Sequence, residues 1–77
     1  MKKIYTRQEP ENLEKIRKAL HEDGVVEVHN QYETVYGVDF DDWLRKGLSD
    51  LDCDFKVTSW CHFEYRYPWT YIITLKR

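Results

Sequence analysis

The last third of the chain alternates between apolar and polar positions. From residue 55 to residue 75, every odd-numbered position except Ser59 is apolar or aromatic. Successive side chains of a β-strand leave opposite faces of the sheet, so a period of two is typical of a half-buried strand. A single strand of this length would span about 70 Å, whereas a compact chain of this size has a radius of gyration of about 11–12 Å. The segment therefore predicts a long C-terminal β-hairpin.

The apolar set keeps its parity throughout this segment, which requires a loop of odd length or a bulge. We predict the turn at residues 66–68, because Pro68 lacks the N–H group that a strand ladder needs. This turn would pair three sets of residues on the buried face: Phe63 with Tyr71, Cys61 with Ile73, and Ser59 with Leu75. The opposite face would carry Thr58, Trp60, His62, Glu64, Thr70, Ile72, Thr74 and Lys76.

Two segments have the apolar spacing of amphipathic helices. The first begins at Pro10, which is favoured at a first helical position, and Gly24 is placed to end it. The second follows Gly37, with Asp39 as its N-cap. Gly47 interrupts it at a cost of about 1 kcal/mol relative to Ala, and such a glycine often marks close packing against a neighbour. The apolar residues at helical spacing are Leu13, Ile16, Ala19 and Leu20 in the first helix and Phe40, Trp43, Leu44, Leu48 and Leu51 in the second.

Three further stretches are rich in β-branched and aromatic residues. Residues 2–7 predict a short edge strand, and residues 25–29 predict a second strand. Residues 32–36 have the same character, so residues 25–36 form either a hairpin or one strand and a long loop; we favour the hairpin. The chain is thus predicted to be one α+β domain, residues 1–77. We expect two layers, in which an antiparallel sheet packs against two helices and leaves its other face open.

Composition limits the classes of function. The net charge is −2, from 12 Lys and Arg against 14 Asp and Glu, so no overall basic field attracts nucleic acid. Two cysteines are too few for a secreted disulfide scaffold, and the sequence shows no signal peptide, lipidation site or transmembrane run. We predict a soluble, cytoplasmic protein without a membrane partner. The aromatic content of 16% helps a short chain to bury area, and formation of a homodimer would be another way to do so.

The sequence contains no diagnostic catalytic or metal-binding motif. Cys61 and His62 are adjacent, and neighbouring residues of a strand point to opposite faces, so they cannot form a dyad. Ser59 has no nearby base in sequence. No CxxC or HxxxH spacing predicts a metal site, and no glycine-rich loop predicts a nucleotide cofactor. We therefore predict that the protein has no catalytic residues, binds no metal ion and uses no cofactor.

Two pairs of an acid and an imidazole stand out. Glu27 and His29 share one face of a predicted strand, and His62 and Glu64 share one face of another. If these strands were neighbours, the four groups could cluster on the open face and titrate together near about pH 6–7. A cross-strand salt-bridge surface is the simpler interpretation.

Aromatic residues and one arginine concentrate around the predicted C-terminal turn. Tyr, Trp and Arg dominate interface hot spots because they bury much area and keep a polar tip. We therefore predict a small non-enzymatic protein-binding module, an inhibitor or regulator that occludes a larger partner through this aromatic hairpin, as small phage-type accessory proteins do. The expected partner-binding residues are Trp60, Tyr65, Arg66, Tyr67, Trp69 and Tyr71.

Two other interpretations of these aromatic residues remain open. The rings could stack the bases of single-stranded nucleic acid, a less favoured alternative in which Lys2, Lys3, Lys76 and Arg77 would add a basic edge. Several of the rings could instead cap the small core.

Overall fold

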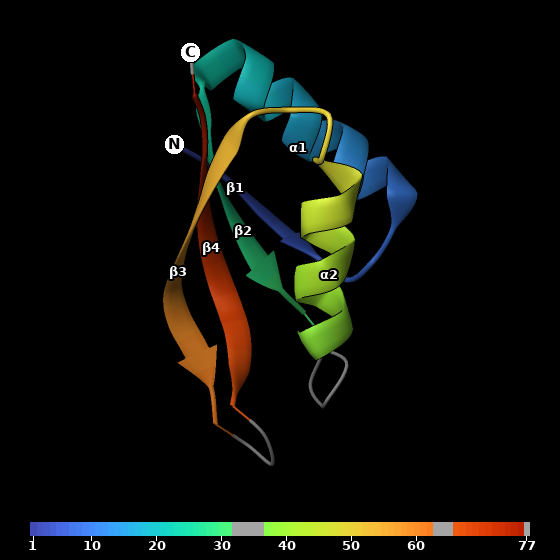
Figure 1. Cartoon of the computed structure of the whole chain (residues 1–77), viewed down its shortest axis with the longest axis vertical. Coiled ribbons are helices and arrows are strands. Elements are labelled where there is room, and N and C mark those ends of the chain that lie inside the picture. Colours follow the sequence, from blue (N-terminus) through green and yellow to red (C-terminus); the bar gives the residue numbers. More distant parts are fainter. Residues whose placement is uncertain (32–36, 63–65, 77) are drawn as a thin grey trace.

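The computed structural model describes residues 1–31, 37–62 and 66–76 of the chain. All four strands belong to one sheet, and both helices lie on the same side of it (Figure 1). The predicted two-layer α+β fold with a C-terminal hairpin is confirmed. In chain order the elements are β1 (Lys2–Thr6), α1 (Pro10–Asp23), β2 (Val25–Asn30), α2 (Gly37–Gly47), β3 (Cys53–Cys61) and β4 (Tyr67–Leu75).

The sheet is mixed, with strand order β1-β2-β4-β3. β1 and β2 pair in parallel, whereas β4 is antiparallel to both β2 and β3. The prediction of a wholly antiparallel sheet was therefore wrong in one pair. The reason is that α1 lies between β1 and β2 in the chain, and a helical crossover returns the chain to the end of the sheet from which it started. β1 and β3 are the two edge strands.

Local signals at both ends of α1 determine its length. Pro10 occupies the first turn, as predicted, and the carboxylate of the preceding Glu9 accepts hydrogen bonds from the Thr6 hydroxyl and the Arg7 amide, each at 2.8 Å. The bond from Thr6 lowers the pKa of Glu9 below its ordinary value. Gly24 ends the helix in the left-handed region with φ 77°, and its N–H donates to the Leu20 carbonyl at 2.9 Å. In the described part of the chain, neither helix is long and apolar enough to cross a membrane.

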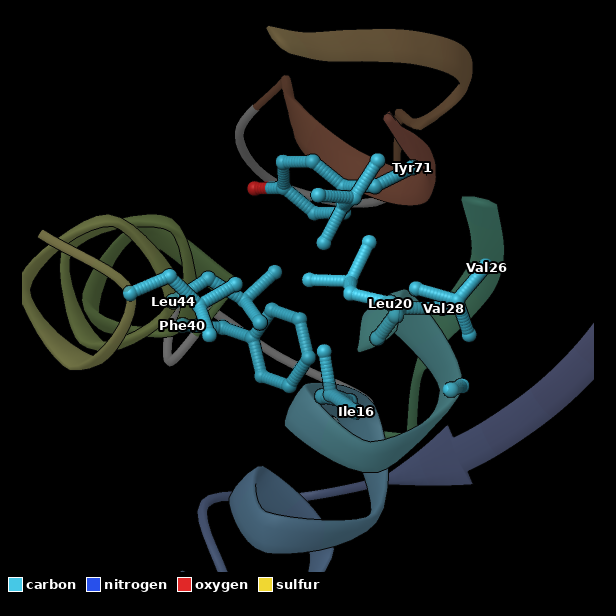
Figure 2. Close-up of a cluster of buried hydrophobic side chains, with 10 residues drawn as sticks. Ile16, Leu20, Val26, Val28, Phe40, Leu44 and Tyr71 are labelled. Atoms are coloured by element: carbon cyan, nitrogen blue, oxygen red, sulfur yellow. The ribbon is translucent and has the colours of Figure 1, made fainter. Parts of the chain in front are cut away.

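The core lies between the helix layer and the sheet (Figure 2). The apolar stripes predicted for the two helices face the odd-numbered positions of β4 and the even-numbered positions of β2. This arrangement explains why the period of two and the helical period were both readable in the sequence. The buried cluster consists of Ile16, Ala19, Leu20, Val26, Val28, Phe40, Leu44, Leu48, Tyr71 and Ile73.

Gly47 is the last residue of α2 and packs closely against α1. A Cβ atom built on it would lie 2.7 Å from Cδ2 and 2.9 Å from Cδ1 of Leu13, so the close packing predicted for this glycine is present. Arg17 of α1 also reaches this point, where it donates to the Gly47 carbonyl at 2.6 Å and to both carboxylate oxygens of Asp50. The helix ends earlier than predicted, and Leu48 joins the core from the turn that follows.

We expect Gly47→Ala to lower the free energy of unfolding by about 1 kcal/mol. Alanine favours the helix by about 1 kcal/mol, but a clash of this size costs about 1–3 kcal/mol. The same substitution in a Leu13→Ala background should be neutral or stabilising, because the two methyl groups in the way are gone. Urea unfolding of the four proteins of this double-mutant cycle measures the coupling. Stabilisation by Gly47→Ala in the otherwise unchanged chain would show that Leu13 yields freely.

The register of the C-terminal hairpin differs from the prediction. Tyr71 pairs with Val57 rather than Phe63, and Ile73 pairs with Phe55 rather than Cys61. The last pair before the loop is Cys61 with Tyr67, so the connection is of odd length, as expected, but centres on residue 64. A turn at residues 66–68 would have left residues 53–56 beyond the reach of β4, whereas they pair with Ile72, Ile73, Thr74 and Leu75. The observed register instead pairs nearly all of both strands.

Two irregularities accompany this register. Pro68 is accommodated within β4 because it lies beyond the last pair with β2, His29 with Thr70, where β4 has only β3 beside it. The β3–β4 pairing shifts on both sides of Ser59, which pairs with Thr70 and not, as predicted, with Leu75. β2 ends at Asn30. The second strand predicted at residues 32–36 lies outside the described residues.

Candidate functional site

The face of the sheet opposite the helices is uncovered. Ile4, Val28 and Tyr71 point toward the helix layer and pack in or against the core. Because side chains alternate along a strand, the residues next to them point the other way. The uncovered face comprises Lys3 and Tyr5 from β1, Glu27 and His29 from β2, Pro68, Thr70, Ile72 and Thr74 from β4, and Asp54, Lys56, Ser59 and Trp60 from β3.

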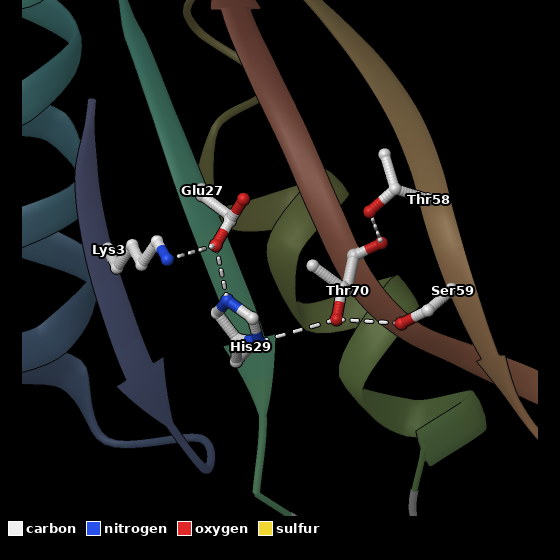
Figure 3. Close-up of polar contacts among 6 residues, drawn as sticks. All are labelled: Lys3, Glu27, His29, Thr58, Ser59 and Thr70. Carbon is white, nitrogen blue, oxygen red and sulfur yellow. Dashed lines mark hydrogen bonds and ion pairs between the residues drawn. The ribbon is translucent and has the colours of Figure 1, made fainter.

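A row of polar side chains crosses this face (Figure 3). His29 Nε2 lies 2.6 Å from Glu27 Oε2, and its Nδ1 lies 3.3 Å from the Thr70 hydroxyl. The Ser59 hydroxyl donates to Thr70 Oγ1 at 2.8 Å. At the other end, Lys3 Nζ lies 3.9 Å from Glu27. The row thus links all four strands, and the shift in pairing at Ser59 places its hydroxyl beside Thr70.

With a neutral His29 imidazole, the donors and acceptors of the row follow a consistent order. A carboxylate only accepts, so His29 donates from Nε2 to Glu27, and its Nδ1 is then free to accept from the Thr70 hydroxyl. The hydrogen bond from His29 lowers the pKa of Glu27, and the charge of Lys3 acts in the same direction. The carboxylate therefore remains ionised and keeps the imidazole in this orientation.

The same order of groups, acid, imidazole and hydroxyl, occurs in enzymes that use a hydroxyl nucleophile. Such enzymes also need donors that stabilise the developing negative charge. Thr70 is 7% exposed and lies within a strand paired with neighbours on both sides, so its backbone is engaged in the sheet ladders.

The condition set for a cluster of the two acid–imidazole pairs, that their strands be neighbours, is not met. β4 separates β2 from β3, so the strand of His29 is not a neighbour of the strand that leads to His62. His62 is exposed just beyond β3, and Glu64 lies outside the described residues. His29 instead interacts with Glu27 of its own strand and with Thr70 of the next.

Two exposed aromatic side chains flank the polar row. Tyr5 is 55% exposed and stacks on the His29 ring, with centroids 4.4 Å apart and an interplanar angle of 17°. Trp60 is 40% exposed, and the Arg66 guanidinium lies 4.5 Å from its ring centroid. Pairing with Pro68, the neighbour of the buried Tyr67, places Trp60 on the uncovered side. Each ring is therefore held by a polar neighbour before any partner arrives.

The expected partner-binding residues divide into two groups. Trp60 and Arg66 are exposed and in contact, and Trp69 is half-buried. Tyr67 and Tyr71 are corrections, because they are 1% and 0% exposed and cannot touch a partner in this conformation. Both occupy odd-numbered positions of β4, which face the helices. Tyr65 lies outside the described residues.

Sequence reasoning missed Tyr5 and the hydroxyl groups of Thr70 and Ser59. A signal for Tyr5 was present, because Ile4 and Tyr5 are adjacent apolar residues of one strand and only one of them can face the core. No signal marked Thr70 as a partner of His29, or Ser59 as a partner of Thr70. Their proximity depends on the order of the strands and on the irregular pairing of β3.

The two cysteines are half-buried and form no disulfide. Burial raises the pKa of the Cys53 thiol, and Asp52 acts in the same direction, so this thiol is a weak nucleophile. Among the residues that the structure describes, no group of three or more His, Cys, Asp or Glu side chains could hold a metal ion.

No protein-family model matches this chain, and comparisons with curated proteins and with solved structures gave no significant match. Its class is therefore defined by its own fold and site. It is a small α+β domain whose mixed four-stranded sheet has one uncovered face with two preorganised aromatic side chains.

Proposed function

We propose that this protein is a non-enzymatic protein-binding module that inhibits or regulates a larger partner by covering part of its surface. The observation that carries the proposal is the position of Tyr5 and Trp60, two large exposed aromatic side chains on the one face that no helix covers. Such side chains bury much area at little entropic cost when neighbours already hold them. Trp60 is thus retained from the predicted partner-binding residues, and Tyr5 is added to it as a second anchor.

The charges on this face favour a protein over a nucleic acid. Lys3 and Lys56 are matched in number by Glu27 and Asp54, so the positive charge that this face has in excess comes from Arg66 beside Trp60. A nucleic acid would need several unpaired cations along its backbone. The contact between Trp60 and Arg66 is the one feature of this face that supports the alternative, base stacking with single-stranded nucleic acid.

The proposal can be tested with the double variant Tyr5→Ala/Trp60→Ala. A matched control, Glu11→Ala/Lys46→Ala, changes two exposed residues of the helix layer. The tagged proteins are used to capture partners from nuclease-treated lysate of the native host, captured proteins are identified by mass spectrometry, and the affinity of each purified partner is measured. We expect the aromatic double variant to bind at least about tenfold more weakly, while the control binds normally and all proteins keep a native circular dichroism spectrum.

Two outcomes would contradict the proposal. Equal affinity of both variants for the same partner would exclude the uncovered face as the docking surface. Capture of nucleic acid alone in untreated lysate, with an affinity for oligothymidylate that falls steeply with salt, would favour base stacking.

The partner could also be a second copy of the chain, through the same face. Light scattering of the wild type and the aromatic double variant distinguishes a homodimer from a complex with another protein.

We also propose that the protein acts in the cytoplasm, where Cys53 and Cys61 would remain reduced.

A further inference from the structure

The free edge of β1 and the neighbouring face of α1 enclose a hollow that the uncovered sheet face does not use. Its volume is about 310 Å³, and it is lined by Lys2, Lys3, Ile4, Lys15 and Lys18. Four of these five side chains are cationic. The fifth, Ile4, lies on the side of the sheet that faces the helices and packs against the core. The hollow therefore combines an apolar floor with a positively charged rim.

The backbone of β1 has hydrogen-bonding groups directed toward this edge. The Thr6 carbonyl points to the β2 side, where it accepts from the Gln31 amide at 2.8 Å. Alternate residues of a strand direct their backbone groups to opposite sides, so those of Lys3 and Tyr5 point away from β2. Within the described residues, β1 pairs with no strand except β2. Its outer edge can accept another strand.

The lysines of the rim are only partly neutralised. Lys2 and Lys18 share Glu22, at 2.6 Å and 3.9 Å, and Lys3 lies 3.9 Å from Glu27. Lys15 forms no ion pair with any residue that the structure describes. Three of the four lysines therefore share two carboxylates, and a ligand with negatively charged side chains would neutralise the remaining positive charge.

The same charges argue against self-association at this edge. Pairing of β1 with β1 of a second copy would bring Lys2 and Lys3 of both chains together, and lysines on edge strands prevent such pairing. The other edge strand, β3, is less suited to strand addition because its pairing is irregular on both sides of Ser59. β1 is therefore the edge strand with regular pairing. The positive charge of its lysines favours an acidic segment as the added strand.

We propose that the edge of β1 and the lysines of α1 form a docking groove for an extended acidic segment of a partner protein, which adds to the sheet as a further strand. Backbone hydrogen bonds to Lys3 and Tyr5 would supply affinity, and carboxylates near Lys15 and Lys18 would supply specificity. A small apolar side chain of the added segment, between its carboxylates, would pack on Ile4. The groove uses the outward backbone of Lys3 and Tyr5 and the lysines of α1, whereas the uncovered face is tested at the side chains of Tyr5 and Trp60, so either surface can fail its test without the other.

The test uses a fluorescein-labelled peptide of alternating Glu and Thr residues and measures its fluorescence anisotropy with the full chain. Lys3→Pro removes the outward amide, and Lys3→Ala is its control because it removes only the side chain. Lys15→Glu/Lys18→Glu reverses the rim, and Lys46→Glu/Lys56→Glu makes the same charge change elsewhere. We expect the rim variant to bind at least about tenfold more weakly than the wild type, and Lys3→Pro at least about tenfold more weakly than Lys3→Ala, whereas Lys46→Glu/Lys56→Glu should stay within about threefold of the wild type. Amide chemical shifts of Lys3 and Tyr5 should move on binding.

Thermal unfolding confirms that each variant is folded before it is compared. Absence of binding by the wild type at millimolar peptide overturns the proposal. Loss of binding in the rim variant with full binding by Lys3→Pro also overturns it, since the lysines would then attract anions without strand addition. Equal binding of oligothymidylate and the peptide, with equal sensitivity to all charge reversals, would identify a general polyanion surface instead.

Discussion

Replacing Tyr71 with alanine is expected to lower the free energy of unfolding by about 3–5 kcal/mol. The side chain is fully buried at the centre of the sheet, and its ring centroid lies 6.0 Å from that of Phe40 on α2. Truncation would leave a cavity between the two layers that neither helix can fill without moving. A single core in a chain of this length supplies about 3–5 kcal/mol, so much of the variant would be unfolded at moderate temperature.

Urea unfolding followed by circular dichroism measures this effect. Tyr5→Ala is the matched control, because the same side chain is removed from an exposed position, and we expect it to cost about 1 kcal/mol or less. Comparable losses at the two positions would contradict the placement of Tyr71 in the core. The comparison also separates folding from binding, since Tyr71→Ala should lose partner binding only to the extent that it unfolds.

Removing the hydroxyl group alone, in Tyr71→Phe, is expected to cost about 1.5–3 kcal/mol near neutral pH. The Tyr71 hydroxyl donates to Asp41 Oδ1 at 2.7 Å, and Arg45 holds the same carboxylate with Nε 3.1 Å from Oδ2. The bond fastens β4 to α2 across the edge of the core. Phenylalanine fills the same space, so the loss comes mainly from a hydrogen bond to a charged acceptor. A cost below about 0.5 kcal/mol would show that water replaces the hydroxyl at Asp41.

Tyr71 should also make the protein sensitive to alkaline pH. Burial raises the pKa of Tyr71 far above its ordinary value of 10.0, and the hydrogen bond to Asp41 acts in the same direction. Below pH 10 the group is neutral in both states, so its contribution to stability is constant. Above pH 10 it ionises only in the unfolded chain, and the free energy of unfolding falls by about 1.4 kcal/mol per pH unit.

The difference between the wild type and Tyr71→Phe isolates this effect, because the other titrating groups are common to both proteins. We expect the difference in stability between the two proteins to shrink as the pH rises above 10. Urea unfolding at several alkaline pH values measures the slopes, and tyrosinate absorbance shows which tyrosines ionise in the folded state. Parallel pH profiles of the wild type and Tyr71→Phe would contradict a raised pKa.

The sequence by itself determined the elements and their inner faces. Pro10 and Gly24 marked both ends of α1, the helical spacing of Phe40 and Leu44 marked the inner face of α2, and the odd-numbered positions near Tyr71 marked the buried face of the hairpin. These features depend on side-chain periodicity and backbone preference within one element, which act over a few residues. For the same reason, the acid–imidazole pair of Glu27 and His29 was visible in the sequence.

Only the tertiary structure decided how the elements meet. The register that pairs Tyr71 with Val57, the parallel pairing of β1 with β2, and the contact of His29 with Thr70 all join residues distant in the chain. Periodicity fixes the face of a strand but not its partner, since a shift of two residues keeps every side chain on the same face. Partner and register follow from which arrangement buries the most apolar surface and satisfies the most backbone groups in the whole chain. The uncovered face and the lysine-rimmed groove are consequences of that arrangement.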